Sequence, residues 1–89
     1  MPDHGIHAAG RLDLGDGMAV LVDIDGHYFF EHWCDRHLRI PESEPYLIAP
    51  SLGAHTCAGP IETLTVLPSI LCPDCGTHGF LTEGVWRGC

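Results

Sequence analysis

Two cysteines three positions apart lie near the end of the sequence, in the turn Cys72-Pro73-Asp74-Cys75-Gly76. Two thiols at this spacing, with Pro inside the turn and Gly just after it, are typical of a zinc knuckle. A knuckle supplies only two ligands, whereas a structural zinc ion takes four. The turn therefore predicts a Zn²⁺ site whose other two ligands come from elsewhere in the chain.

The second pair of ligands is predicted at Cys34 and His37, which repeat the same spacing inside residues 31–40. With Cys72 and Cys75 they would form a Cys₃His site that closes a long loop. An alternative interpretation is about equally supported: a surface turn with Cys34 as a small buried hydrophobe and His37 in solvent.

Two further residues are reserve ligands, Cys57 and His78. Cys57 lies in a predicted loop, residues 51–60, together with His55, but a separation of one residue is less usual for a zinc pair. His78 follows Cys75 by three residues. It could be a ligand itself or a hydrogen-bond donor to one.

The rest of the chain predicts a small all-β domain that has to position these ligands. The β-rich segments 18–24 and 27–30 flank Asp25-Gly26, the strongest short-range signal for a hairpin with a type I′ turn. A second hairpin is predicted from residues 79–82 and 85–87. We expect Phe80 and Trp86 of this hairpin to pack on the core.

Short strands are expected between the hairpins, at residues 46–49 and as a central strand at 61–67, because both segments are apolar and partly β-branched. No ten-residue stretch has convincing helical periodicity, so little helix is expected beyond one irregular or short helical turn near residues 33–38. The predicted fold is two hairpins plus short strands, in a compact sheet or sandwich that a zinc knuckle staples.

The chain is short enough to form one domain. Residues 1–17 are rich in Gly, Asp and His and predict a flexible arm, which leaves residues 18–89 as a single zinc-binding β domain. A core of this size is marginal, and small domains often need a metal or disulfides. Five Cys without a secretory signal favour reduced thiols and metal binding over disulfides.

Acidic residues outnumber basic ones by twelve to four, and the net charge is -8. Such a chain has no cationic field with which to bind phosphates, so direct nucleic-acid binding is not expected, whereas a basic protein partner is permitted. No apolar run is long enough to span a membrane, so no membrane association is expected. Homo-oligomerisation stays open.

Enzyme signatures with fixed spacing are missing, and no catalytic residue is assigned. A zinc deaminase needs His-x-Glu and Pro-Cys-x-x-Cys, and neither occurs. Asp23, Asp25 and Gly26 are similar to the start of a calcium loop, but the remaining ligands are absent and the turn interpretation is stronger. Two alternatives remain: a zinc hydrolase with an open metal position and Glu31 or His32 as base, and a Cys-x-x-Cys redox or metal-carrier protein.

The last quarter of the chain resembles the end of short phage- and prophage-encoded proteins of unknown function. The positions that match are Pro68, Ser69, Ile70, His78, Gly84 and Trp86. The resemblance implies a phage-related origin and no established activity. We therefore expect a small acidic zinc-binding protein that acts through protein–protein interaction, as a virion or accessory component or as an inhibitor of a host factor. Its expected location is the cytoplasm of a bacterial host or the virion.

Overall fold

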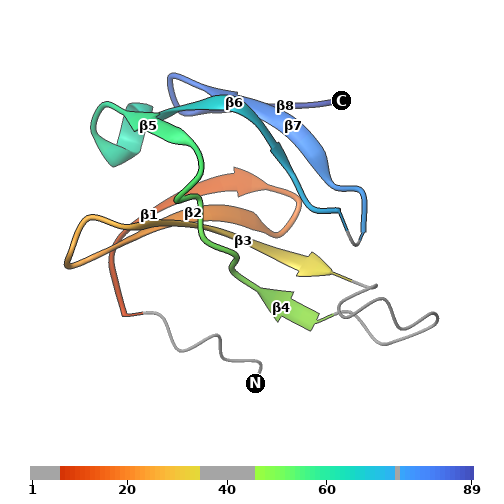
Figure 1. Ribbon diagram of the computed structural model, residues 1–89, viewed down its shortest axis with the longest axis horizontal. Helices are drawn as coiled ribbons and strands as arrows, with labels where there is room; N and C mark the ends of the chain where they lie inside the picture. The colour runs from red at the N-terminus through yellow and green to blue at the C-terminus, as the bar shows by residue number, and fades with distance from the viewer. Residues whose placement is uncertain (1–6, 35–45, 74) are drawn as a thin grey trace.

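The computed structural model describes residues 7–34, 46–73 and 75–89, which form two four-stranded antiparallel sheets (Figure 1). The first sheet has the order β1 (Ala8–Gly15), β2 (Met18–Asp23), β3 (Tyr28–Cys34), β4 (Tyr46–Ile48). The second has the order β5 (Thr56–Ala58), β6 (Thr65–Leu71), β7 (His78–Thr82), β8 (Val85–Gly88). A short 3₁₀ turn, η2 (Ile61–Thr63), precedes β6. The predicted all-β fold with little helix is confirmed.

The predicted hairpin between β2 and β3 is present, with Ala19 opposite Glu31 and Val22 opposite Tyr28. Its turn is longer than a type I′ turn, because the Asp23 amide donates a 3.0 Å hydrogen bond to the His27 carbonyl. Of the two central residues expected to have positive φ, only Gly26 does. The type I′ prediction is therefore wrong, although the hairpin is right.

The first strand of the structure lies where the sequence predicted an irregular arm. Residues 8–15 form β1, which pairs with β2 along its length, so the arm prediction is wrong for these residues. Leu12 and Leu14 are half-buried and alternate with exposed neighbours, which is the two-residue period of a strand. The many glycines and aspartates of the segment favoured an irregular arm over a strand, because the alternation of apolar residues is short.

The second sheet differs from prediction at its first two strands. Residues 61–63 form η2 instead of strand, and β6 continues through Pro68 to Leu71. Pro68 is tolerated inside a strand because it lies at the register shift between Val66 and Ile70. Residues 56–58, predicted as loop, form β5, which makes β6 a central strand as expected.

The C-terminal hairpin agrees with the sequence. Thr82 lies opposite Val85, and the two residues between them, Glu83 and Gly84, both have positive φ. This is the geometry that a type I′ turn requires, and a glycine at the second position meets it without steric cost.

The core lies between the two sheets. It consists of Val20, Phe30, Leu52, Leu64, Val66, Ile70 and Leu81, which are all buried. Trp86 packs against this cluster and stacks on Phe30 with ring centroids 5.5 Å apart, as predicted. Phe80 does not join the core, because its side chain is 46% exposed on the opposite face of β7.

The two sheets meet at one end of β3. In Figure 1 the connection between β6 and β7 descends toward the end of β3. Trp33 and Cys34 belong to this strand and not to the short helical turn expected near residues 33–38; residues 35–38 lie outside the described ranges. The predicted knuckle and the predicted Cys34 are thus brought to the same end of the molecule.

Candidate metal centre

The end of β3 contributes two donors, His32 and Cys34. Side chains alternate across a strand, so Phe30, His32 and Cys34 share one face and point between the sheets. All three are buried, with His32 1% exposed and Cys34 fully covered. The ring of His32 stacks on Phe30 at a centroid distance of 4.8 Å, which fixes its position beside the core.

The connection between β6 and β7 contributes the other two donors. Its backbone closes by hydrogen bonds from the Cys72 amide to the Thr77 carbonyl at 2.8 Å and from the Gly76 amide to the Cys72 carbonyl at 2.9 Å. Gly76 has a φ of 78°, a left-handed conformation that glycine adopts without penalty. This tight turn holds Cys72, which is buried, and Cys75, which is half-buried.

The donor atoms of these four residues lie within 4.8 Å of one another, and we call His32, Cys34, Cys72 and Cys75 the thiol–imidazole cluster. The sulfur atoms of Cys34 and Cys72 are 4.0 Å apart. In a tetrahedral site with zinc–sulfur bonds of about 2.3 Å, neighbouring sulfurs would be about 3.8 Å apart. The cluster therefore has a geometry that could hold a metal ion.

The imidazole of His32 has one nitrogen engaged and one without a hydrogen bond. Nδ1 lies 3.4 Å from the Phe30 carbonyl, while Nε2 is buried and has no hydrogen-bond partner. Burial lowers the pKa of His32 below its ordinary value, against the opposing effect of the Phe30 carbonyl. The neutral ring with a proton on Nδ1 leaves a lone pair on Nε2, and metal-bound histidines commonly have this arrangement.

The pKa of the Cys75 thiol depends on its contacts within the turn and with Cys34 of β3. Burial on its own would raise the pKa of Cys75, but a hydrogen bond with the Thr77 hydroxyl at 3.1 Å and contacts with Cys72 and Cys34 outweigh it. The net effect lowers the pKa. Since the thiolate is the form that binds metals, this shift favours ligation.

Three of the four predicted ligands, Cys34, Cys72 and Cys75, are brought together in this cluster. The fourth, His37, lies outside the described residues. Among the residues that the structure describes, the fourth donor is instead His32, which the sequence interpretation treated only as a candidate base. Phe30, His32 and Cys34 occupy alternate positions of a strand, and this pattern indicates that His32 and Cys34 share a face. A helical turn near residues 33–38, as expected from the sequence, does not place them together.

The reserve ligands do not belong to the cluster. The Nε2 atom of His78 and the Ser69 hydroxyl share a hydrogen bond of 2.8 Å. Cys57 is half-buried in β5, and burial raises the pKa of its thiol. His55, the companion of Cys57 in the sequence, bonds to the Ser69 carbonyl through Nε2 at 2.9 Å.

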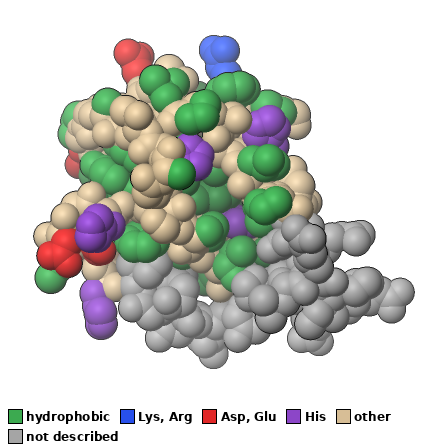
Figure 2. Space-filling view, viewed as in Figure 1, with side chains coloured by type: hydrophobic (Ala, Val, Ile, Leu, Met, Phe, Trp, Pro, Cys, Tyr) green, Lys and Arg blue, Asp and Glu red, His purple; other side chains and the backbone are tan. Residues whose placement is uncertain are grey.

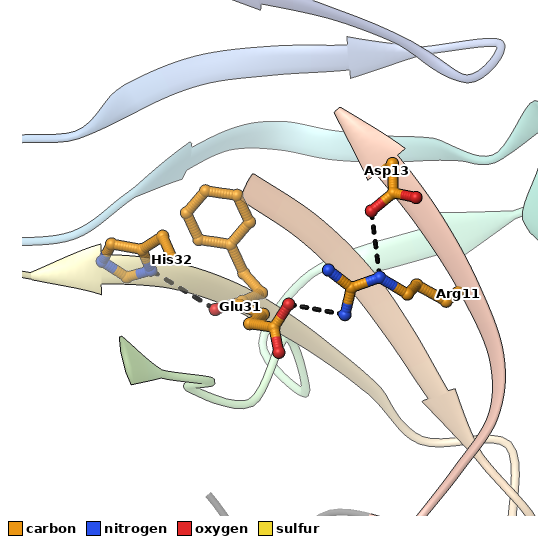
Figure 3. Close-up of polar contacts among 5 residues, drawn as sticks. Arg11, Asp13, Glu31 and His32 are labelled. Atoms are coloured by element: carbon orange, nitrogen blue, oxygen red, sulfur yellow. Dashed lines mark hydrogen bonds and ion pairs between the residues drawn. The ribbon is translucent and has the colours of Figure 1, made fainter. Parts of the chain in front are cut away.

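The other candidate base, Glu31, points away from the cluster. Glu31 is 5% exposed, and one of its carboxylate oxygens lies 2.6 Å from the guanidinium of Arg11, which also contacts Asp13 (Figure 3). Neighbouring residues of β3 face opposite sides of the sheet, so His32 and Glu31 cannot share one site. The Glu31 carboxylate is held in an ion pair that ties β1 to β3.

A second group of donors lies at the other end of β3, in the turn formed by Asp23, Asp25 and His27. Its members are half-buried or exposed. One Asp23 oxygen accepts hydrogen bonds from the amides of Asp25 and His27 at 2.9 and 2.8 Å, and the other lies 3.5 Å from the His27 ring. These contacts account for the group as the internal bonding of a turn.

No family model, curated protein or solved structure matches the chain. Within the described ranges, no helix has the length and apolar character needed to cross a bilayer.

Proposed function

We propose that the protein is a small zinc-binding β module that acts by binding another protein, with zinc in a structural role. The zinc part of this proposal rests on one observation: the His32 imidazole is grouped with three cysteine sulfurs, and its buried Nε2 atom has no hydrogen-bond partner. An unpaired buried polar atom costs about 1–3 kcal/mol, and a metal ion removes that cost.

The donor set favours zinc over harder cations. Three thiolates and one imidazole suit Zn²⁺ in tetrahedral geometry, whereas Ca²⁺ and Mg²⁺ require oxygen ligands. Four protein donors complete the coordination sphere and leave no position for a reactive water. This is the arrangement of a structural site, and it supports the stabilising role more than a hydrolytic one.

The position of the cluster supports a structural role as well. His32 and Cys34 belong to the first sheet, while Cys72 and Cys75 join strands of the second. Cys34 and Cys72 are 38 residues apart in the chain. A metal at this point would tie the two sheets together and close a long loop, and in a domain of this size it would supply much of the folding free energy.

The binding part of the proposal rests on the outer side of the second sheet. Four large hydrophobic side chains are exposed there: Leu67, Leu71, Phe80 and Val85. They alternate with core residues along β6, β7 and β8, so they share the side opposite to the core. We call these four residues the outer apolar face. Hydrophobic side chains also reach the surface along the upper side of Figure 2.

The charge of the chain indicates which kind of protein would cover this face. The net charge is -8, and Glu83 lies in the turn directly before Val85. A partner with an apolar patch and a basic rim would complement both features. The phage-like C-terminal pattern favours two roles for the protein: a virion or accessory component, or an inhibitor of a host factor. It would act in the cytoplasm of a bacterial host or in the virion.

Elemental analysis of protein purified without added zinc tests the metal. We expect about one zinc per chain and a lower melting temperature after chelation. Zinc near zero, together with no change of melting temperature in chelator, would rule out the structural metal.

The surface is tested by capture from a lysate of phage-infected cells, followed by binding measurements with the purified captured protein. The double variant Leu67→Ser/Phe80→Ser should weaken that binding by at least about tenfold while it retains its zinc. Ile24→Ser is the matched control, because Ile24 is 83% exposed but lies in the β2–β3 turn. Equal binding by the parent and the double variant would refute the outer apolar face.

A further inference from the structure

The thiol–imidazole cluster is not equally protected on all sides. Cys34 and Cys72 are fully covered or nearly so, with 0% and 4% exposure, whereas Cys75 is only half-buried. The neighbouring Gly76 is exposed, and a Cβ added there would meet no atom within 4 Å apart from its chain neighbours, so this part of the turn faces open space. A small solute can therefore approach the cluster at this sulfur.

The other thiols lie within reach of Cys75. Its sulfur is within 4.8 Å of those of Cys72 and Cys34. Cys72 belongs to the same turn, so a bond of about 2.05 Å between the two sulfurs needs side-chain rotation and no movement of one sheet against the other. Cys34 belongs to the opposite sheet. The turn thus combines an accessible thiol with a nearby buried one, which is the arrangement that converts an oxidised cysteine into a disulfide.

We propose that Cys75 is an oxidation site for small hydroperoxides, and that its conversion to a disulfide with Cys72 releases the metal. This inference rests on the proposed zinc site. In the first step the Cys75 thiolate attacks a peroxide oxygen, the S–O bond forms, the O–O bond breaks, and the leaving hydroxide takes a proton to become water. In the second step the Cys72 thiolate attacks the sulfenic sulfur, the S–S bond forms, the S–O bond breaks, and the leaving hydroxide takes a proton to become a second water.

The balance of this reaction accounts for the loss of metal. Two thiolates give up two electrons, and hydrogen peroxide with two protons becomes two waters. A zinc ion held by the cluster would lose two of its four ligands, and Cys34 and His32 alone would hold it weakly. A dithiol reductant reverses the reaction by thiol–disulfide exchange, after which zinc binds again. The metal link between the two sheets would therefore depend on the peroxide concentration around the protein.

Thr77 gives a test that leaves all four ligands in place. Its hydroxyl lies 3.1 Å from the Cys75 sulfur and, when that sulfur is a thiolate, donates a hydrogen bond to it. In the zinc-bound protein this bond withdraws electron density from the attacking sulfur. The variant Thr77→Val should therefore release zinc faster in peroxide, by about threefold to tenfold.

The experiment uses zinc-loaded protein with Cys57→Ser and Cys89→Ser, which removes the thiols outside the cluster. Hydrogen peroxide is added, zinc release is followed with a chromogenic chelator, and disulfides are mapped by mass spectrometry. We expect zinc release in step with one Cys72–Cys75 disulfide, and recovery after addition of dithiothreitol and zinc. The Thr77→Val change, made in the same background, should accelerate the release.

Three results would overturn the proposal: zinc retained while peroxide is consumed, a disulfide that contains Cys34, or an unchanged release rate in Thr77→Val. Failure of the zinc site would be seen separately, as protein that binds no zinc before any oxidant is added. In that case the disulfide mapping still tests the oxidation site: a Cys72–Cys75 disulfide after peroxide would support it, and the absence of this disulfide would overturn it.

Discussion

The two ends of β3 each gather donors that could hold a metal, but they differ in how those donors are satisfied. At the Tyr28 end, Asp23, Asp25 and His27 lie within 4.8 Å of one another in a turn that is half-buried or exposed. At the Cys34 end, the thiol–imidazole cluster is mostly buried. Proximity of donors is therefore common to both sites and does not distinguish them.

Hydrogen bonding does distinguish the two ends. The Asp23 carboxylate accepts hydrogen bonds from two backbone amides, so bonding within the turn accounts for the closeness of these donors. The imidazole of His32, which is grouped with three cysteine sulfurs, instead has a buried nitrogen without a hydrogen-bond partner. A group of donors indicates a metal when burial makes an unpaired atom costly, and it indicates only a turn when the backbone already satisfies the donors.

The largest expected effect comes from Cys72→Ser at the buried end. Binding of structural zinc is worth about 10–16 kcal/mol in small domains, which is comparable with the whole stability of about 5–15 kcal/mol. The variant should lose its zinc and be largely unfolded at 25 °C, as measured by elemental analysis and circular dichroism. Cys57→Ser, outside the cluster, should keep both metal and fold. A folded, zinc-free Cys72→Ser protein would contradict the structural role.

His32→Ala should have the next largest effect. It removes the nitrogen ligand, and we expect zinc affinity to fall by about 100-fold or more in competition with a chelating dye. His55→Ala is a strict control, because His55 also bonds a backbone carbonyl through one nitrogen and has a buried second nitrogen without a hydrogen-bond partner. His55 is not part of the thiol–imidazole cluster, so the His55→Ala variant should bind zinc with the same affinity as the parent. Equal zinc affinity in the two variants would remove His32 from the site.

A smaller effect is expected from the ion pair on the other side of β3. Arg11→Met leaves the buried Glu31 carboxylate without its guanidinium partner. Because Arg11 is 47% exposed, solvent weakens the ion pair, and we expect a loss of about 1–2 kcal/mol in urea unfolding with unchanged zinc content. Loss of zinc in this variant would show that the two sides of the strand are coupled.

The smallest effect is expected at the exposed end. Asp23→Ala removes the acceptor of two amide hydrogen bonds, and should lower stability slightly without changing zinc content. The pKa of Asp23 is lowered from its ordinary value of 3.8, chiefly by the hydrogen bond from the His27 amide. The folded state therefore binds fewer protons there, so this contribution is present above about pH 3.8 and is lost as the pH falls through the folded pKa.

This pH dependence is measured by urea unfolding of the parent and Asp23→Ala, from pH 7 down to the lowest pH at which the parent unfolds cooperatively. The stability difference should be constant at neutral pH and shrink on acidification. A difference that grows with acid, or a variant that loses zinc, would contradict the separation of the two ends.

The sequence predicted the fold class because strand patterns and turn chemistry are local. The type I′ turn at Glu83-Gly84 and the hairpin between β2 and β3 follow from neighbouring residues alone. Strand β1 was missed because its alternation of Leu12 and Leu14 is short and lies among glycines and aspartates. Phe80 was misplaced because hydrophobicity alone does not tell which side of a strand faces the core.

For the candidate site, the sequence predicted the types of ligand, cysteine and histidine, but not all of the residues that supply them. Cys72 and Cys75 follow from the spacing of the knuckle, and Cys34 from the need for a second pair. His37 is predicted from the three-residue spacing of a turn and lies outside the described residues. Within those residues, a strand brings side chains two positions apart to the same side, which places His32 beside Cys34. Which strand ends meet depends on the packing of the two sheets, and no local pattern contains that information.

X-ray absorption spectroscopy of the zinc in freshly purified protein tests the central claim most directly, because it reports the ligands of the metal itself. The cluster predicts three sulfur ligands at about 2.3 Å and one nitrogen ligand at about 2.0–2.1 Å. The His32→Ala variant, reloaded with zinc, should lose the imidazole signal. A coordination shell dominated by oxygen and nitrogen, or an imidazole signal that persists in His32→Ala, would contradict the thiol–imidazole cluster as the metal centre.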